Sequence, residues 1–211
     1  MSTAYCEEIK PKGTTQFQKV TGDDPDEYRS HWDALMDTKA YIYGKEPSEI
    51  VKENYGLLKP GRVLDIAMGE GRHAVFLAKK GFIVDGVDFS EVAIRKAKKL
   101  AAENHVSITT IKADLSTYQM RPEYYDSMVD IDFYMKSLIP QIKRGLKRGG
   151  VIIFEANTVD QMKNAPDQHL NKDWLLEKGE LKELFKDFKI ISYRETNDGK
   201  EAKASLIAKK P

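Results

Sequence analysis

Short apolar segments alternate with longer amphipathic segments through the middle of the chain. Residues 151–154 are apolar throughout, as in a strand that is buried on both faces, whereas residues 90–102 repeat apolar side chains at helical spacing. This alternation predicts a parallel sheet with helices on both faces and right-handed crossovers, a doubly wound α/β fold. The predicted strands are Val63–Ile66, Phe82–Val87, Ile108–Ile111, Ser127–Ile131 and Val151–Phe154.

The C-terminal part of the pattern differs from the rest. A short helix is predicted over Leu181–Phe188, then strands over Ile190–Tyr193 and Ala204–Ala208, with a turn at residues 196–200 between them. Two strands joined by so short a turn run antiparallel. The sheet is therefore expected to end with a reversed strand.

The helix before the fifth predicted strand has the clearest apolar face. Its apolar side chains recur from Leu138 to Leu146, with Ser137 as the expected N-cap and Pro140 in the first turn. Gly149-Gly150 is expected to end it, because glycine is the preferred residue beyond a helix C-terminus.

Composition along the chain suggests three parts. Residues 1–26 are polar and turn-prone and are expected to form a flexible arm. Residues 27–58 are expected to form a helical cap segment, because Trp32 and Met36 share a helical face and Pro47-Ser48 can open a second helix. The alternating pattern places the principal domain at residues 59–211.

Charge and cysteine content restrict the function classes. The 211 residues include 34 Lys and Arg against 33 Asp and Glu, which argues against a nucleic-acid partner. Cys6 is the only cysteine and no secretory pattern precedes it, so a cytoplasmic location is expected. No apolar run is long enough to cross a membrane, and the four histidines lack metal-ligand spacing, so neither a membrane nor a metal is expected. No pattern indicates an oligomeric state.

A glycine loop follows the first predicted strand. Gly69-x-Gly71-x-x-Ala74 allows a ligand to approach the backbone, and the helix that follows presents free N–H groups to anionic parts of it. Asp88 ends the second predicted strand, where a carboxylate can accept from both hydroxyls of a ribose. Together these features predict a nucleoside-containing cofactor, although the glycine pattern alone is a weak signal.

Acidic residues also stand at the predicted carboxyl edge of the sheet. Asp65 lies inside the first strand, where it either contacts the ligand or ties down the N–H groups of the glycine loop. The remaining acids favour a site for a cation, with helix caps and loop acids as the alternative for some of them. They are Asp88, Asp114, Asp130, Asp132 and Glu155.

These motifs resemble those of the class I S-adenosylmethionine-dependent methyltransferases. Within that superfamily, residues 43–47, 69–72 and 181–193 are similar to the tellurite-resistance branch, which acts on small molecules. The resemblance implies a Rossmann-like, mostly parallel seven-stranded sheet whose last strand is antiparallel, with S-adenosylmethionine as cofactor. It is carried by Val63–Arg72, Asp88, Ala113–Leu115, Tyr125–Asp126 and Leu146–Gly150.

The resemblance also implies roles for individual residues. Arg72 would meet the methionine carboxylate and Asp88 the ribose, although Arg72 could instead be an exposed arginine of the first helical turn. Phe89 would cover the adenine or belong to the core. The full expected cofactor-binding set is Tyr43, Asp65, Gly69, Gly71, Arg72, Asp88, Phe89, Asp114, Leu115 and Asp130.

Two positions depart from the family pattern. Ala67-Met68 replaces a common Gly-Cys pair and should narrow the cofactor groove slightly. His73 stands where asparagine is frequent and is expected to alter one contact.

The expected reaction is a direct, in-line methyl transfer to a small molecule, in which the protein supplies alignment. The expected acceptor is a thiol or a chalcogen compound of selenium or tellurium. Tyr43 and Trp32 are candidates to close over the sulfonium, with ordinary helix packing as the alternative. An NAD-dependent oxidoreductase and a non-catalytic binding module are the competing hypotheses. The catalytic candidates are Asp130, Asp132, Glu155 and Tyr43.

Overall fold

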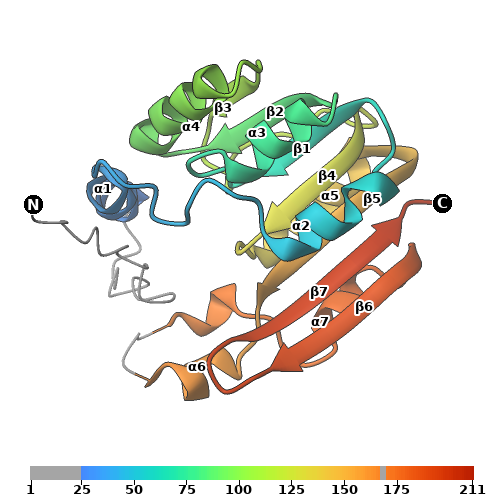
Figure 1. Ribbon diagram of the computed structural model, residues 1–211. Helices are drawn as coiled ribbons and strands as arrows, with labels where there is room; N and C mark the ends of the chain where they lie inside the picture. The colour runs from blue at the N-terminus through green and yellow to red at the C-terminus, as the bar shows by residue number, and fades with distance from the viewer. Residues whose placement is uncertain (1–24, 167–169) are drawn as a thin grey trace, which may run out of the picture.

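The computed structural model describes residues 25–166 and 170–211, which form an α/β structure around one seven-stranded sheet (Figure 1). Nearly all of the predicted arm at residues 1–26, including Cys6, lies outside the described residues. The strand order is β3-β2-β1-β4-β5-β7-β6. The strands are β1 (Arg62–Ile66), β2 (Ile83–Asp88), β3 (Thr109–Lys112), β4 (Tyr125–Ile131), β5 (Leu146–Asn157), β6 (Lys189–Asn197) and β7 (Ala202–Lys209).

The sheet is parallel except at one strand. Strands β1 to β5 run parallel to one another, whereas β7 is antiparallel to both β5 and β6. The predicted sheet with a reversed last strand is therefore confirmed. The register pairs Ile66 with Asp130 and Asp130 with Phe154, so the carboxyl ends of β1 and β4 meet at one edge.

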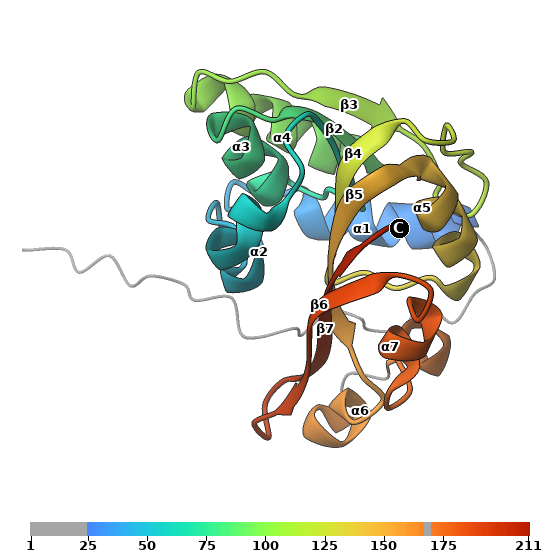
Figure 2. The ribbon, with the colours of Figure 1, turned by 90° about the vertical axis from the view of Figure 1, so that its right-hand side faces the viewer.

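Helices cover both faces of this sheet, as Figure 2 shows in a view along its edge. Alternate side chains of β1 supply the two cores: Val63 packs with Leu77 on one face, and Leu64 packs with Ile142 on the other. On the first face lie α2 (Glu49–Asn54), α3 (Arg72–Lys79) and α4 (Glu91–Glu103), and on the second lie α5 (Ile139–Gly145) and α7 (Glu180–Leu184).

Helix α1 (Pro25–Met36) packs against α4 beside the sheet (Figure 1). Trp32 and Met36 form a small apolar cluster with Ala93 of α4, which agrees with the predicted helical spacing. Ser90 caps α4 by accepting from the N–H of Ala93 at 3.0 Å. Residues 37–47 then run from α1 toward α2.

The predicted helix over residues 137–148 is wrong at both ends. Ser137 is not its N-cap but lies inside the 3₁₀ turn η2 (Lys136–Leu138), and α5 already ends at Gly145. Gly149-Gly150 belongs to β5, where Gly149 N donates to Lys210 O and Lys210 N donates to Gly150 O. A Cβ on Gly150 would lie 2.9 Å from Asp126 O, so this glycine permits close strand approach and does not end a helix.

The remaining described segments are short. A 3₁₀ turn η1 (Tyr55–Leu57) follows α2, and the connection from β5 to α7 contains α6 (Gln161–Asn164) and η4 (Lys172–Trp174). No helix among the described residues is both long and apolar enough to span a membrane.

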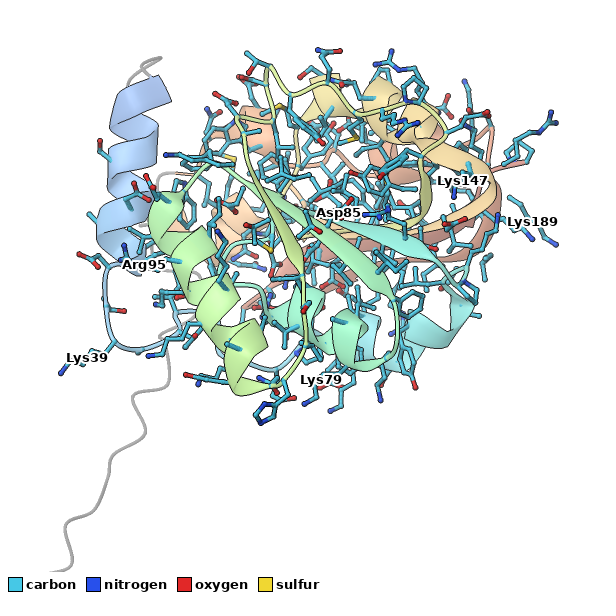
Figure 3. The ribbon with its side chains drawn as sticks, turned by 90° about the horizontal axis from the view of Figure 1, so that it is seen from above. Lys39, Lys79, Asp85, Arg95, Lys147 and Lys189 are labelled. Carbon is cyan, nitrogen blue, oxygen red and sulfur yellow. The ribbon has the colours of Figure 1, made fainter. Side chains whose placement is uncertain are left out.

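Most charged side chains lie at the surface. In Figure 3, Lys39, Lys79 and Lys189 lie at the periphery, whereas Asp85 lies within the fold. Asp85 is buried and its Oδ1 is 2.6 Å from Nη1 of Arg62. This ion pair satisfies a charge that burial alone would strongly disfavour.

Candidate functional site: a cavity at the carboxyl edge of the sheet

The two glycines of the loop between β1 and α3 serve different purposes. Both have positive φ angles, 56° at Gly69 and 86° at Gly71. A Cβ on Gly69 would have no neighbour nearer than Ala67 O at 4.0 Å, so the first glycine leaves space beside the loop. A Cβ on Gly71 would lie 2.7 Å from that of Ala97, so the second glycine lets the loop approach α4.

A cavity of about 170 Å³ lies beside this loop, at the carboxyl ends of the central strands. It is the place at which an open α/β sheet normally binds its ligand. Four candidates do not line it: Asp65, Gly71, Asp130 and Glu155. The candidates that line it together are Tyr43, Gly69, Arg72, Asp88, Phe89, Asp114, Leu115 and Asp132.

Asp88 connects the loop to the end of β2. Its Oδ2 accepts from Gly69 N at 2.7 Å and its Oδ1 accepts from Ser90 N at 2.8 Å. Burial raises its pKa to about 6, against the opposing effect of these N–H donors. The Phe89 N–H also donates to this carboxylate, which still keeps acceptor capacity for a ligand hydroxyl.

Asp65 and Asp130 lie behind the cavity wall. Both are about 1% exposed, and each has one carboxylate oxygen with no hydrogen-bond partner among the described residues. Burial raises the pKa of both groups well above the usual value, and each is also near another carboxyl group. Asp65 accepts from the backbone of Ala74, the kind of contact expected if it ties down the glycine loop.

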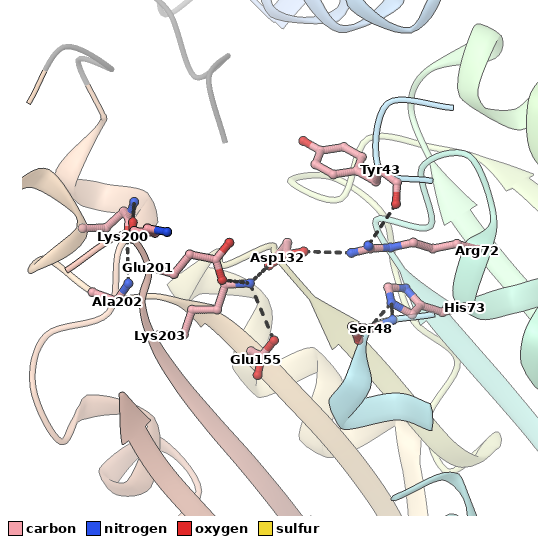
Figure 4. A network of polar contacts seen from close by, with 11 residues as sticks. Tyr43, Ser48, Arg72, His73, Asp132, Glu155, Lys200, Glu201, Ala202 and Lys203 are labelled. Atoms are coloured by element: carbon pink, nitrogen blue, oxygen red, sulfur yellow. Dashed lines mark hydrogen bonds and ion pairs between the residues drawn. The ribbon is translucent and has the colours of Figure 1, made fainter. Parts of the chain in front are cut away.

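Arg72 and Asp132 form an ion pair at the cavity, shown in Figure 4. Arg72 Nη2 donates to Asp132 Oδ2 at 2.9 Å and its Nη1 donates to Tyr43 O at 3.2 Å. Lys203 Nζ lies 3.0 Å from Asp132 Oδ1 and 3.8 Å from Glu155. Burial would raise the pKa of Asp132, but Lys203 and Arg72 together lower it, so this carboxyl group is ionised.

Three aromatic candidates reach the cavity. Tyr43 is 38% exposed, its N–H donates to Glu70 Oε2 at 3.5 Å, and its ring centroid lies 5.5 Å from the Arg72 guanidinium carbon. Trp32 and Phe89 line the cavity and also pack in the apolar cluster of α1 and α4. Trp32 and Phe89 therefore each pack in the apolar cluster and line the cavity.

His73 connects α3, the helix that follows the glycine loop, to the start of α2. It is 5% exposed, and its Nε2 accepts from Ser48 N at 3.2 Å (Figure 4). Burial and the nearby Arg72 lower its pKa to about 3, so the ring is neutral at physiological pH. Its observed partners are the backbone and hydroxyl groups of Ser48.

The side chain of Met68 packs against Gly86 of β2. Met68 is buried, and a Cβ on Gly86 would lie 2.0 Å from its sulfur atom. Gly86 therefore makes room for the methionine side chain within the core. Ala67 has a φ of 49°, a conformation that is unfavourable for any residue with a Cβ.

The part of the cavity wall that follows β4 and β5 was not predicted from the sequence. The run Phe133-Tyr134-Met135 comes directly after Asp132, just beyond the end of β4. This apolar run was the sequence signal that could have identified the wall. Trp174 and Leu175 lie far along the chain from β5, and only the fold brings them here. Among the described residues, no group of three or more His, Cys, Asp or Glu side chains is placed to hold a metal ion.

The strand order, the reversed β7, the glycine loop and the acid at the end of β2 together define the class I methyltransferase fold and its ligand cavity. The family model described as "Tellurite resistance protein TehB" matches residues 35–204, and the chain belongs to this family.

Individual relatives are more distant. The "Probable S-adenosyl-L-methionine-dependent methyltransferase TehB" of Haemophilus influenzae is 26% identical over 147 residues, which cover 66% of this chain and 50% of that protein. The "Ribosomal RNA small subunit methyltransferase C" of Alcanivorax borkumensis is 33% identical over 113 residues, or 50% of this chain and 35% of that protein. The chain thus spans about half, or less, of the length of these curated relatives.

Solved structures share the fold. The crystal structure of TehB from Haemophilus influenzae superposes with a TM-score of 0.65 at 22% identity, covering 87% of this chain and 67% of that one. A structure titled "Conversion of a Disulfide Bond into a Thioacetal Group during Echinomycin Biosynthesis" gives a TM-score of 0.65 at 19% identity, with 87% and 93% coverage. At these identities the likeness concerns the fold alone.

Proposed function

We propose that this protein is an S-adenosylmethionine-dependent methyltransferase that methylates a small molecule directly. The observation that carries the proposal is the single cavity shared by Gly69, Asp88, Asp114 and Tyr43, residues from four separate segments that the resemblance assigns to one cofactor. Membership of the TehB family and the printed name of the Haemophilus influenzae relative support it.

The residues present fit this cofactor. Gly69 leaves open space beside the loop, and Asp88 offers carboxylate lone pairs where a ribose is expected. Asp88 and Asp114 give the cavity the negative charge that suits a sulfonium. When bound, the cofactor supplies a methyl group already activated on sulfur.

The chain's own residues would bind and orient the cofactor and enclose the acceptor beside it. Arg72 is placed to hold a carboxylate by exchanging its contact with Asp132, and Phe89 can cover an adenine face. Tyr43 presents an aromatic ring at the cavity, where cation–π attraction to a desolvated cation is worth roughly 0.5–2 kcal/mol. Alignment of the acceptor within this enclosure would supply much of the rate enhancement.

A general base is needed only for an acceptor that must lose a proton. Of the four candidates, Asp132 and Tyr43 line the cavity, whereas Asp130 and Glu155 do not. Asp132 is ionised but neutralised by Arg72 and Lys203, which makes it a weak base. Burial raises the pKa of Tyr43, so its hydroxyl would act through hydrogen bonding. These properties favour an acceptor that is nucleophilic without a strong base, such as a thiol.

Replacement of Tyr43 tests its enclosing role. Tyr43→Ala should weaken S-adenosylmethionine binding and slow turnover, and Tyr43→Phe should retain both because it keeps the ring. Calorimetry and a turnover assay give the two values. Unchanged binding and turnover in Tyr43→Ala would discard this role.

Two measurements separate the proposal from its rivals. In a thermal-shift comparison, S-adenosylmethionine should raise the melting temperature and NAD should not, because ligands that bind only the native state stabilise it. Release of S-adenosylhomocysteine should then be measured with thiols, selenite, tellurite, amines and an RNA oligonucleotide as acceptors. No product above background with any acceptor would favour a binding module without catalysis, and methylation of the RNA would contradict the small-molecule assignment.

A further inference from the structure

The cavity has two halves with different side chains. Asp88, Phe89, Asp114 and Leu115 follow β2 and β3, on one side of β1 in the sheet order. The other half lies beyond β4 and β5, on the opposite side of β1. If the first half holds the adenosyl group, as the proposed function requires, the second half holds the methyl acceptor. Its walls include Phe133, Tyr134, Met135, Asn157, Trp174 and Leu175.

This second half, which we call the acceptor chamber, has one ionised side chain among its described walls, Asp132, which directly follows β4. Asp132 is compensated by Arg72 at 2.9 Å and by Lys203 at 3.0 Å, and it keeps the second partner if a cofactor carboxylate takes Arg72. Of the other acidic lining residues, Glu70 is paired with Lys96, whereas Asp88 and Asp114 would repel an anion. The described part of the cavity therefore offers an anionic acceptor no uncompensated cation.

The walls of the chamber are fixed by hydrogen bonds. Tyr134 donates its hydroxyl to Glu180 Oε1 at 3.0 Å, and Lys136 Nζ lies 2.6 Å from the same oxygen. Leu176 N donates to Asn157 O at 3.0 Å, which holds the segment carrying Leu175 and Trp174 against the end of β5. The apolar surface is thus preformed, and the side-chain amide of Asn157 is the polar group in it that is nine-tenths buried.

We propose that the methyl acceptor is a small uncharged molecule with an apolar body, such as a benzyl or branched alkyl thiol, and not a chalcogen oxyanion. This inference rests on the proposed function. Burial of an anion without a cationic partner is strongly unfavourable, whereas an apolar body gains from each contact with these walls. With a thiol, the new carbon–sulfur bond forms as the methyl–sulfonium bond breaks, and the thiol proton passes to water. The products are a methyl thioether and S-adenosylhomocysteine.

A matched pair of probes tests the charge preference without relying on turnover. Phenylmethanethiol and 4-(mercaptomethyl)benzoate share one body and differ by a carboxylate. Calorimetry on the protein saturated with S-adenosylhomocysteine, which lacks the sulfonium charge, measures the contribution of the chain itself. We expect phenylmethanethiol to bind at least tenfold more tightly than the benzoate, and selenite to produce no heat.

A variant that adds a positive charge tests the same inference through a change of preference, so that the test does not depend on loss of binding alone. Met135→Lys places a cation in the chamber wall and should remove or reverse the preference for the uncharged thiol. Met162→Lys adds the same charge at an exposed methionine that does not line the cavity, and it should keep the native preference.

The outcomes separate this inference from the proposed function. If S-adenosylhomocysteine binds and the native protein takes the benzoate or selenite as tightly as phenylmethanethiol, the acceptor inference is wrong while the cofactor assignment stands. Failure of all three probes to bind would also overturn it. If S-adenosylhomocysteine itself does not bind, the proposed function fails, and the acceptor inference fails with it.

Discussion

Ala67 shows at the scale of one residue how this chain departs from its family. Its φ of 49° is a conformation that a Cβ makes costly by roughly 1–2 kcal/mol, which agrees with the glycine that the sequence resemblance leads one to expect here. The strain lies at the cavity wall, directly before the glycine loop.

Ala67→Gly should therefore stabilise the protein by about 0.5–1 kcal/mol, after the greater freedom of glycine in the unfolded chain is subtracted. Urea denaturation measures the change in free energy of unfolding. Ala78→Gly, in helix α3, serves as the control and should destabilise by about 0.5–1 kcal/mol. Destabilisation by both substitutions would show that Ala67 is unstrained.

His73 is a buried residue that predicts a pH dependence. Its pKa is about 3 in the folded protein, whereas in the unfolded chain it is near 6.5, so below pH 6.5 the unfolded state binds the extra proton. Its contribution to stability is fully present above pH 6.5 and is lost as the pH falls toward 3. Urea denaturation at pH 7.5 and pH 5 should show a loss that is about 2 kcal/mol smaller in His73→Asn.

The carboxyl groups do not obscure this comparison. Burial raises the pKa of Asp88, so its contribution changes with pH in the opposite sense, but it is common to both proteins and cancels in the difference. An identical pH dependence in the native protein and the variant would contradict the buried, neutral state of His73.

Asp88 also predicts how cofactor affinity depends on pH. With a pKa of about 6 it is protonated in more acidic solution and then accepts fewer hydrogen bonds from a ribose. Calorimetry from pH 5 to pH 8 should show affinity that is constant above pH 7 and falls by up to tenfold per unit below pH 6. The series should be repeated in His73→Asn, and an affinity that rises on acidification would exclude a carboxylate contact.

At the scale of elements, residues 37–43 form a strap between α1 and α2 that a buried lysine holds in place. Lys96 of α4 forms an ion pair with Glu70 of the glycine loop, and its Nζ also donates to Met36 O at 3.1 Å and Ala40 O at 2.5 Å. The Tyr41 hydroxyl donates back to Lys96 O at 3.1 Å. Two hydrogen bonds and one ion pair of Lys96 thus fix the strap to the loop beside the cavity.

Lys96→Met should destabilise the protein by about 3–5 kcal/mol, because it leaves the carboxylate of Glu70 buried without its cation. The double variant with Glu70→Gln should recover part of this loss. Urea denaturation measures these changes in stability. Hydrogen exchange of the backbone amides in the strap should be faster in the single variant than in the native protein. Lys45→Met breaks an exposed pair with Glu103 and should change little, and an equal effect of both lysines would contradict the account.

The sequence predicted the type of an element where burial of apolar side chains alone set the pattern. The apolar β1 and the spaced apolar face of α4 were predicted within a residue or two, because burial sets both patterns. The end of α5 was not, because Gly149-Gly150 serves strand pairing with a segment near the C-terminus, and that contact cannot be read locally. The three-part division of the chain stays a prediction.

At the level of the whole molecule, the meeting of the expected cofactor residues at one cavity could be predicted, because these residues stand at or just after strand ends. Gly69, Asp88 and Asp114 follow β1, β2 and β3, and the fold brings all three to one edge. Trp174 and the ion pair of Arg72 with Asp132 depend on segments far apart in sequence, so no local pattern announces them. The burial of Asp65 and Asp130 behind the wall has the same origin.

Calorimetry with S-adenosylmethionine at pH 7.5 shows whether this cavity binds an adenosyl sulfonium. We expect one molecule bound per chain, an affinity that Tyr43→Ala reduces, and no heat from NAD at the same concentration. Absence of heat with S-adenosylmethionine at saturating concentration, or binding of NAD in its place, would contradict this expectation.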